Sequence, residues 1–173
     1  MLHVALYQPI IPQNVGNIAR TCVGMNAHLH IIGPTIVDLS DKAVRRAGLD
    51  YWDDLTLAQH ENPETFIDWI SANGISPYLV TKFGQQRYDQ PAYRDGDLLL
   101  FGSEREGLPQ TIHDQYPDHR ISIPIPGAVR SYNLGNSVAI VLATAMSRAE
   151  LWPKDWSPKD GYIPPNTFTL DHG

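Results

Sequence analysis

Short apolar runs that could each form a buried strand recur along this chain, and several of them end in polar segments rich in glycine or proline. Leu2–Tyr7 is followed by Pro9 and Pro12, and Asp97–Phe101 is followed by Gly102. Segments with helical spacing lie between such runs, and strands that alternate with helices are typical of an α/β domain with a largely parallel sheet. Because loops after parallel strands gather at one edge of a sheet, the sequence predicts a ligand crevice there.

The elements are expected in a regular order along the chain. Strands are predicted over Leu2–Tyr7, His28–Ile32, Leu55–Ala58, Tyr78–Thr81, Asp97–Phe101 and Arg120–Ile125. Helices are predicted from Asn14, which could cap the first of them, near Asp41–Ala47, over Pro63–Ser71 with Asn62 as its cap, and over Tyr132–Leu151. The segment between Thr81 and Asp97 is polar and rich in turn residues, which predicts a mobile loop over the site.

The 173 residues and 42% hydrophobic content suit one core rather than two. We expect a single domain over residues 1–151 and an irregular extension over residues 152–173, which is rich in proline and lacks periodicity. No apolar run approaches the roughly 20 residues of a membrane helix, and the N-terminus lacks a signal-peptide pattern, so a cytoplasmic protein is expected. Cys22 is the only cysteine, which excludes an internal disulfide.

The net charge of −6 argues mildly against a nucleic-acid partner. However, the charge is unevenly distributed, because residues 51–70 contain five acidic side chains and no lysine or arginine. The densest basic candidates are Lys42, Arg45 and Arg46, which would share much of one helical face. An RNA-binding face and an ordinary solvated helix both fit this pattern.

Several common cofactor and catalytic patterns do not occur in the sequence. It contains neither the G-x-G-x-x-G of a dinucleotide site nor the G-x-x-x-x-G-K-[ST] of a triphosphate loop, so a nucleoside ligand without phosphates fits the glycine- and proline-rich loops better. Ser103 lacks the G-x-S-x-G context of a hydrolase nucleophile. His28 and His30 alternate on a predicted strand, but no third ligand follows at a recognisable spacing, so no metal site is predicted.

Three polar segments far apart in the sequence combine into one predicted site. They read N-V-G-N-I-A-R-T (Asn14–Thr21), F-G-S-E-R-E-G-L (Phe101–Leu108) and I-P-I-P-G-A-V-R-S-Y-N-L-G-N-S (Ile123–Ser137). In this order they resemble motifs 1, 2 and 3 of the SPOUT superfamily of S-adenosylmethionine-dependent RNA methyltransferases. A fourth segment, D-K-A-V-R-R-A-G-L-D-Y-W (Asp41–Trp52), is similar to the small YibK/TrmL-like branch, whose members methylate the ribose of a wobble cytidine or uridine. The resemblance covers about residues 1–151.

The resemblance implies a fold, a cofactor and partners. The implied fold is a mostly parallel sheet flanked by helices, with the C-terminal segment threaded as a deep trefoil knot. The implied cofactor is S-adenosyl-L-methionine, bent within the knot and converted to S-adenosyl-L-homocysteine without a metal ion. The implied substrate is the ribose 2′-oxygen of nucleotide 34 in a leucine tRNA. The chain is expected to act as a homodimer without a membrane partner.

Positions that match the family motifs are the expected site residues. Those expected to act at or around the reacting groups are Arg20, Asn14, Glu104, Ser131 and Asn133. Those expected to line the cofactor pocket are Leu79, Gly102, Ile123, Pro124, Ser131 and Leu134. Those expected to contact RNA phosphates are Lys42, Arg45, Arg46 and Arg130. Simpler structural explanations stay open, with Asn14 and Asn133 as helix caps and Gly102 in an ordinary turn at a strand end.

The family model gives Arg20 the task of activating the ribose hydroxyl. A guanidinium has a pKa above about 12 and is therefore a poor base. We expect Arg20 instead to clamp the adjacent phosphate and to orient the 2′-hydroxyl. Ala143 occupies the position where this branch often carries a tyrosine near the substrate, which leaves the nucleotide preference open. A ribosomal RNA 2′-O-methyltransferase and a non-catalytic RNA-binding homologue are the alternative functions.

Overall fold

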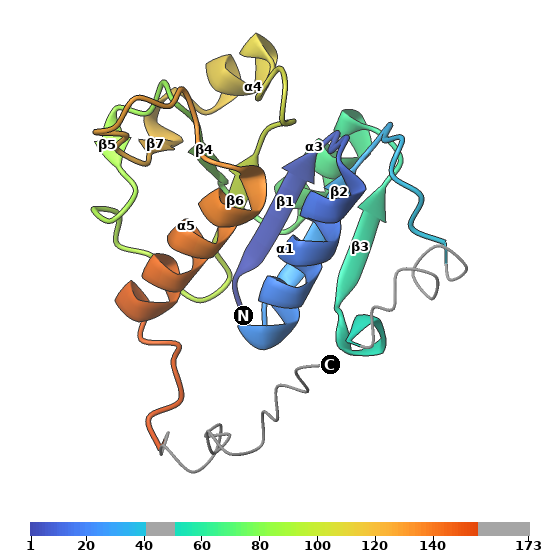
Figure 1. The fold of residues 1–173 in the computed structure, drawn as a ribbon, viewed down its shortest axis with the longest axis horizontal. Coiled ribbons are helices and arrows are strands. Elements are labelled where there is room, and N and C mark those ends of the chain that lie inside the picture. The colour runs from blue at the N-terminus through green and yellow to red at the C-terminus, as the bar shows by residue number, and fades with distance from the viewer. Residues whose placement is uncertain (41–50, 156–173) are drawn as a thin grey trace, which may run out of the picture.

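The computed structural model describes residues 1–40 and 51–155, and within them seven strands form a single sheet (Figure 1). The strand order is β3-β2-β1-β6-β4-β7-β5, and every pair of neighbours is parallel. The strands are β1 (His3–Tyr7), β2 (His28–Ile32), β3 (Leu57–His60), β4 (Tyr78–Val80), β5 (Gln86–Arg87), β6 (Leu98–Phe101) and β7 (Arg120–Ser122). The predicted α/β class with a mostly parallel sheet is confirmed.

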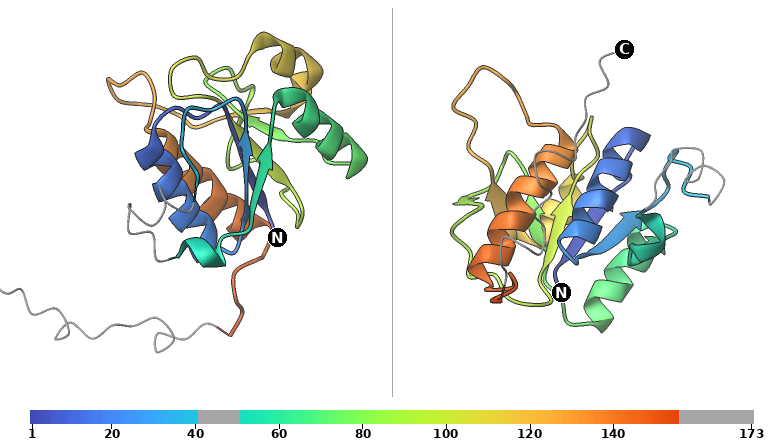
Figure 2. Two further views of the ribbon diagram at one scale, coloured as in Figure 1. Left: turned by 90° about the vertical axis from the view of Figure 1, so that its right-hand side faces the viewer. Right: turned by 60° about the horizontal axis from the view of Figure 1, so that its bottom comes forward.

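Helices cover both faces of the sheet, as the side view in Figure 2 shows. One face carries α1 (Pro12–Gly24) and α5 (Leu134–Arg148), which pack side by side, and the other face carries α3 (Pro63–Ala72) and α4 (Gln110–Gln115). Two single turns of 3₁₀-helix, η1 (Trp52–Asp54) and η2 (Pro117–His119), precede β3 and β7. None of the helices in the described ranges combines the length and the apolar character needed to cross a membrane.

Alternating side chains along β1 divide the apolar core into two layers. Val4 and Leu6 point toward α1 and α5, where they join a cluster that includes Ile18 and Val138. Ala5 points toward α3 and α4 and belongs to the second cluster. Since both faces are covered, the central strands are apolar throughout, and all four residues of β6 are buried.

Most of the predicted elements are confirmed with small shifts at their ends. The side chain of Asn62 accepts a hydrogen bond of 2.9 Å from the Thr65 backbone N–H, so Asn62 caps α3 as predicted. β3 begins two residues later than expected, and β7 ends at Ser122 rather than at Ile125. The earlier end of β7 agrees with Pro124, which has no N–H for a strand pairing. The expected helix near Asp41–Ala47 lies outside the described residues.

The segment between β4 and β6 is not only a loop, because it contains the edge strand β5. β7 lies between β4 and β5 in the sheet, although β4 and β5 are consecutive along the chain. The Thr81 N–H donates to the Ile121 carbonyl (2.9 Å), and the Gln85 N–H donates to the Arg120 carbonyl (3.1 Å). A Cβ on Gly84 would lie 2.3 Å from the Ile121 carbonyl carbon, so the connection between β4 and β5 passes too close to β7 for any side chain. The later strand is therefore inserted between two earlier ones.

The carboxyl ends of the central strands bring the three sequence motifs to one edge of the sheet. The first motif begins seven residues after β1 ends, the second overlaps the end of β6, and the third begins directly after β7. Since β1, β6, β4 and β7 are neighbours in that order, these loops emerge next to one another. This is the edge at which open α/β sheets bind their ligands.

Three histidines, His3, His30 and His60, pack between the sheet and α3, where each ring contacts Trp69. His3 Nδ1 lies 2.9 Å from His30 Nε2, and His30 Nδ1 lies 3.0 Å from His60 Nε2. Burial and the neighbouring histidines lower the pKa of His3 to about 4 and the pKa of His30 to about 3. These imidazoles are therefore neutral at neutral pH.

We expect the free energy of unfolding to decrease as the pH is lowered from about 6.5 to about 4. An unfolded histidine binds a proton near pH 6.5, whereas His3 and His30 in the folded chain stay neutral over this range, so protons favour the unfolded state. The loss from His30 alone is roughly 2 kcal/mol at about pH 5. Urea unfolding with EDTA at about pH 7.5 and about pH 5 measures it. The pH effect should shrink in His30→Phe, and an unchanged pH effect in that variant would contradict the assignment.

Candidate active site

The side chain of Asn14 connects the three motifs. Its Nδ2 donates a hydrogen bond to Glu104 Oε1 (3.0 Å), and its Oδ1 accepts one from Asn133 Nδ2 (2.9 Å). Asn14 is only 5% exposed, so these bonds compete little with water. Three segments that are far apart in sequence are thus held together through one buried amide.

The prediction that Asn14 caps the first helix is wrong. α1 begins two residues before Asn14, with Pro12 as its first residue and Ile11 at the capping position. Proline favours the first helical position because its φ angle already suits a helix and it has no N–H to leave unpaired. The side chain of Asn14 is therefore available to Glu104 and Asn133.

The prediction that Asn133 caps the last helix is confirmed. Its Oδ1 accepts hydrogen bonds from the backbone N–H groups of Gly135 (2.8 Å) and Asn136 (3.3 Å). Its Nδ2 is the group that donates to Asn14. Asn133 therefore serves as a helix cap and as a link between motifs 1 and 3 at the same time.

The Glu104 carboxylate anchors the segment that leads into α1. Oε2 accepts a hydrogen bond from the Ile10 N–H (3.0 Å), and Oε1 accepts one from the Ile11 N–H (3.2 Å) as well as that from Asn14. Burial raises the pKa of Glu104, but these hydrogen bonds outweigh it and hold the pKa below its usual value. The ionised carboxylate also lies at a helix N-terminus, where a negative charge is favourable. The sequence indicated no structural role for Glu104, whereas the structure shows this one.

The loop after β6 folds back tightly on itself. Ser103 and Gly107 exchange backbone hydrogen bonds of 3.2 and 3.0 Å, and Gly107 has a φ of +76° that favours glycine. A Cβ on Gly102 would lie 2.1 Å from the Gly107 carbonyl carbon. The loop therefore requires glycine at position 102 for its own geometry, as expected for an ordinary turn at a strand end. The same tight loop positions Glu104.

Arg20 lies on the exposed side of α1, and Tyr51 supports its side chain. The Arg20 guanidinium carbon lies 4.8 Å from the centre of the Tyr51 ring. The Tyr51 hydroxyl donates a hydrogen bond of 2.8 Å to the Gly16 carbonyl, which fixes the ring against α1. Tyr51 was not among the predicted site residues, although it belongs to the fourth motif and could have been found there.

The predicted cofactor residues surround the ends of β4, β6 and β7. Leu79 lies in the middle of β4 rather than at its end, and its side chain is completely buried in the core. Ile123 and Leu134 are half-buried, whereas Pro124 and Ser131 are exposed. The structure therefore leaves only some of these side chains accessible to a ligand.

The remaining predicted residues do not take part in the hydrogen bonds that join the motifs, or lie outside the described ranges. Arg130 is exposed in the loop that joins β7 to α5, and the Tyr132 hydroxyl donates to the Pro124 carbonyl (3.5 Å) across that loop. Ala143 is half-buried on α5. The predicted RNA contacts that lie outside the described residues are Lys42, Arg45 and Arg46.

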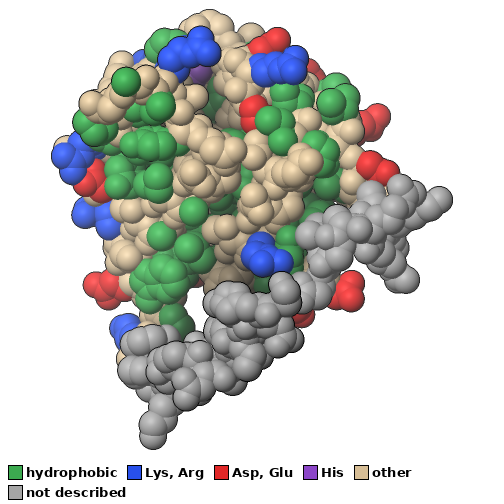
Figure 3. Space-filling model, viewed as in Figure 1, with side chains coloured by type: hydrophobic (Ala, Val, Ile, Leu, Met, Phe, Trp, Pro, Cys, Tyr) green, Lys and Arg blue, Asp and Glu red, His purple; other side chains and the backbone are tan. Residues whose placement is uncertain are grey.

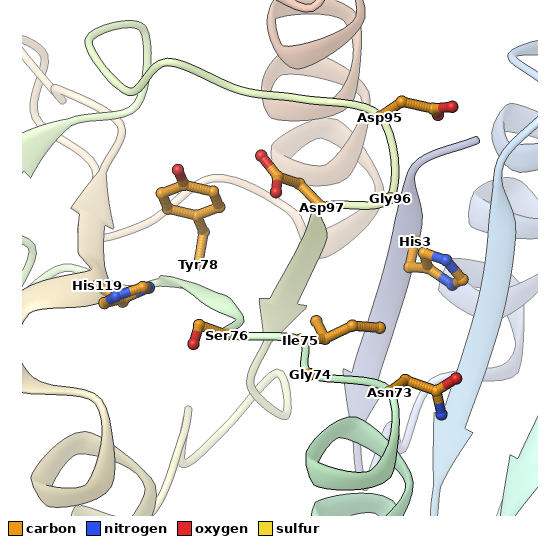
Figure 4. Close-up of a pocket in the computed structure, with 10 residues that line it drawn as sticks. All are labelled: His3, Asn73, Gly74, Ile75, Ser76, Tyr78, Asp95, Gly96, Asp97 and His119. Atoms are coloured by element: carbon orange, nitrogen blue, oxygen red, sulfur yellow. The ribbon is translucent and has the colours of Figure 1, made fainter.

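A cavity of about 520 Å³ lies at the opposite edge of the sheet, near the amino ends of the strands (Figure 4). His3, Tyr78, Asp97 and His119 line it together with the turn after α3. None of the residues that line it belongs to the three motifs. This cavity is therefore distinct from the candidate active site.

An all-parallel sheet covered by helices on both faces, with polar loops joined at the carboxyl ends of its strands, places the chain in the α/β class, and comparison with known proteins identifies the family. Residues 1–143 match the SpoU rRNA Methylase family, and the chain belongs to this family. The resemblance drawn from the sequence motifs is confirmed.

Individual relatives agree with this assignment. A tRNA (cytidine(34)-2′-O)-methyltransferase of Methylovorus glucosotrophus (strain SIP3-4) is 40% identical over 146 residues, which are 84% of this chain and 94% of the relative. A structure described as "Structural insights into the 2-OH methylation of C/U34 on tRNA" has a TM-score of 0.79 and 38% identity, and covers 88% of this chain and 98% of that chain. An AdoMet-bound rRNA methyltransferase of Sinorhizobium meliloti has a TM-score of 0.74 and 28% identity, and covers 84% of this chain and 56% of that chain.

Replacing Glu104 with glutamine should lower the free energy of unfolding by about 2 kcal/mol. The amide NH₂ of glutamine would face one of the N–H donors that the carboxylate now satisfies at Ile10, Ile11 or Asn14. Urea unfolding measures the loss. Glu106→Gln is the matched control, because Glu106 lies exposed in the same loop and its side chain should tolerate the change. Equal unfolding midpoints for the two variants would contradict the anchoring role.

Removing the Tyr51 ring should increase the motion of the Arg20 side chain. A cation above an aromatic ring is stabilised by about 0.5–1 kcal/mol at an exposed site, which is enough to favour one orientation. Tyr51→Leu removes the ring, whereas Tyr51→Phe keeps it and loses only the hydrogen bond to Gly16. Heteronuclear NMR relaxation of Arg20 Nε should show a lower order parameter in Tyr51→Leu than in Tyr51→Phe. The same order parameter in both variants would rule out support by the ring.

Proposed function

We propose that this protein is an S-adenosylmethionine-dependent tRNA 2′-O-methyltransferase that modifies cytidine or uridine 34 of a leucine tRNA. The observation that carries the proposal is the link from Glu104 through Asn14 to Asn133, which joins the three methyltransferase motifs at one edge of the sheet. The relative from Methylovorus glucosotrophus, at 40% identity, supports position 34 of tRNA as the target. The leucine tRNA follows from the motif resemblance.

The residues at the carboxyl ends of β4, β6 and β7 fit the chemistry of this cofactor. Half-buried Ile123 and Leu134 offer apolar contact to an adenosyl group, and the polar loops offer backbone groups that can read its base. The chain has no phosphate-binding glycine loop, and the cofactor has no phosphate. The AdoMet-bound relative from Sinorhizobium meliloti supports the same assignment. When bound, S-adenosylmethionine supplies an electrophilic methyl group.

In this proposal Arg20 positions the ribose 2′-hydroxyl that accepts the methyl group. Methyl transfer to a ribose oxygen is an in-line displacement, so alignment of the oxygen contributes much of the rate. The guanidinium of Arg20 presents a planar set of N–H donors, which suits a phosphate next to the reacting ribose. The ring of Tyr51 packs against the guanidinium and supports it. The hydrogen bonds among Asn14, Glu104 and Asn133 fix α1, the helix that carries Arg20. Ser131 is exposed in the third motif, where it can contribute a further hydrogen bond.

The RNA contacts are proposed from charge. Arg130 is exposed in the loop between β7 and α5, and Lys42, Arg45 and Arg46 belong to the fourth motif. Phosphate contacts of this kind provide affinity and orientation rather than base specificity. Together these four basic residues would form a local basic surface on a protein whose net charge is −6.

The trefoil knot and the domain boundary belong to the same proposal. The insertion of β7 between β4 and β5 supports threading, because the later strand passes beside a connection laid down earlier in the chain. The chain then enters the third motif and α5, which is the segment expected to complete the knot. We infer one domain over residues 1–151, since all described strands join one sheet, and an extension over residues 152–173.

The homodimer is proposed to form through α1 and α5. Figure 3 shows apolar side chains on the face that these helices present, and Ile140 and Ala143 of α5 are only half-buried. A partner subunit on this face would cover that apolar surface and place each active site near the interface. A cytoplasmic location and methyl transfer without a metal ion complete the proposal.

Arg20→Lys should reduce methyl transfer about 10²-fold, because lysine keeps the charge but loses the planar pair of donors that aligns the substrate. The assay uses a radiolabelled methyl donor and total tRNA from a strain that lacks the gene. Cofactor affinity should stay unchanged. Arg94→Lys is the control, because Arg94 is exposed next to the cavity at the opposite edge. Turnover by Arg20→Lys near that of the control would reject the clamp.

Mapping the labelled nucleotide tests the function itself. Label on the ribose of nucleotide 34 in tRNA is the expected result. Label in ribosomal RNA would favour a ribosomal RNA 2′-O-methyltransferase. Cofactor binding without label in either RNA would favour a non-catalytic RNA-binding homologue.

A further inference from the structure

Three histidines that are separated in sequence converge at the beginnings of β1 and β2. His3 is paired with His28 across the two strands, and His30 lies two residues farther along β2. One ring nitrogen from each of these residues lies within 4.8 Å of the others. The sequence showed only His28 and His30 at ligand-like spacing, and the parallel pairing of the strands supplies His3 as the third.

The distances between the ring nitrogens suit a transition-metal ion. In a tetrahedral zinc site with bonds of about 2.0–2.1 Å, two ligand nitrogens are about 3.3 Å apart. His3 Nδ1 and His30 Nε2 are 2.9 Å apart, so they need to separate only slightly to admit an ion between them. His28 is half-buried, and one of its ring nitrogens lies within 4.8 Å of a ring nitrogen of each of the other two.

His60 already holds the ring of the central ligand, His30, in one orientation. His30 Nδ1 lies 3.0 Å from His60 Nε2, so one ring nitrogen of His30 is engaged while the other faces His3. Metal-binding histidines commonly donate their second N–H to such a partner, which fixes the tautomer and the ring orientation. Trp69 of α3 packs 4.5 Å from His30 between ring centres and restricts the ring further.

The cluster is accessible to an ion from solvent. His3 belongs both to the cluster and to the wall of the cavity at this edge (Figure 4). The rings of His3 and His28 are 4.7 Å apart between centres, so His28 adjoins the same approach. The ion would therefore keep one position open toward the cavity.

We propose that His3, His28 and His30 bind one Zn²⁺ ion, with water as the fourth ligand. Three imidazoles and an open position are a donor set that zinc accepts. As a ligand through Nδ1, His3 carries its single proton on Nε2 and stays neutral, and the ion replaces its hydrogen bond to His30. The site lies at the amino ends of the strands, away from the three motifs, and takes no part in methyl transfer. Because the ion joins β1 to β2 beneath α3 in the folded chain alone, it stabilises the folded state.

Cobalt substitution tests the site directly. The full-length chain without an affinity tag is treated with EDTA, exchanged into metal-free buffer and titrated with Co²⁺. We expect a visible absorption band of tetrahedral Co²⁺ that saturates at one ion per chain and disappears when Zn²⁺ is added. A chain that shows no such band would overturn the proposal.

Three variants distinguish this site from other histidines. His28→Gln, at a half-buried position, should abolish the band. His60→Gln should weaken Co²⁺ binding about tenfold, because the His60 ring that orients His30 is lost. His119→Gln, which lines the cavity but is not part of the cluster, should bind Co²⁺ as the unmodified chain does. Circular dichroism confirms that each variant is folded. Unchanged binding by His28→Gln, or loss of binding only in His119→Gln, would place the ion elsewhere and refute the assignment.

Discussion

The candidate active site depends on the buried carboxamide of Asn14. A carboxamide donates and accepts at the same time, so one side chain can hold the Glu104 carboxylate on one side and the Asn133 amide on the other. Aspartate could not donate to Glu104, and leucine could do neither. Loops rich in glycine and proline have little structure of their own, and here their relative positions are set by these two hydrogen bonds and by the anchoring of Ile10 and Ile11 on Glu104.

The carboxyl ends and the amino ends of the strands carry different sites. At the carboxyl ends, β6 lies between β1 and β4, and β4 in turn pairs with β7, so the three motifs emerge from strands that lie close together in the sheet. At the amino ends, the pairing of His3 with His28 collects histidines beneath α3. Both sites result from parallel pairing, because parallel strands align equivalent ends of segments that are distant in sequence.

The sequence predicted the parts of the fold whose signal is apolar periodicity. β6 and the centre of β1 are buried on both faces and are visible as continuous apolar runs, and β2 is a mostly apolar run interrupted by His30. In contrast, β5 consists of exposed Gln86 and Arg87 and has no such signal. Hydrogen-bond partners were harder to predict, because Asn14 has the side chain of a good helix cap and only the position of Pro12 decides against it. The role of Glu104 and the third histidine both depend on contacts between distant segments, which local patterns do not contain.

Helix α1 connects the hydrogen-bonded motifs to Arg20, the residue proposed to contact the RNA. Asn14 and Arg20 are six residues apart on a helix that turns about 100° per residue, so they face different sides of it. Asn14 is buried toward the motifs, while Arg20 is exposed above the ring of Tyr51. Tyr51 in turn is hydrogen-bonded to the backbone of the same helix at Gly16. The orientation of Arg20 is therefore set by hydrogen bonds that Arg20 itself does not make.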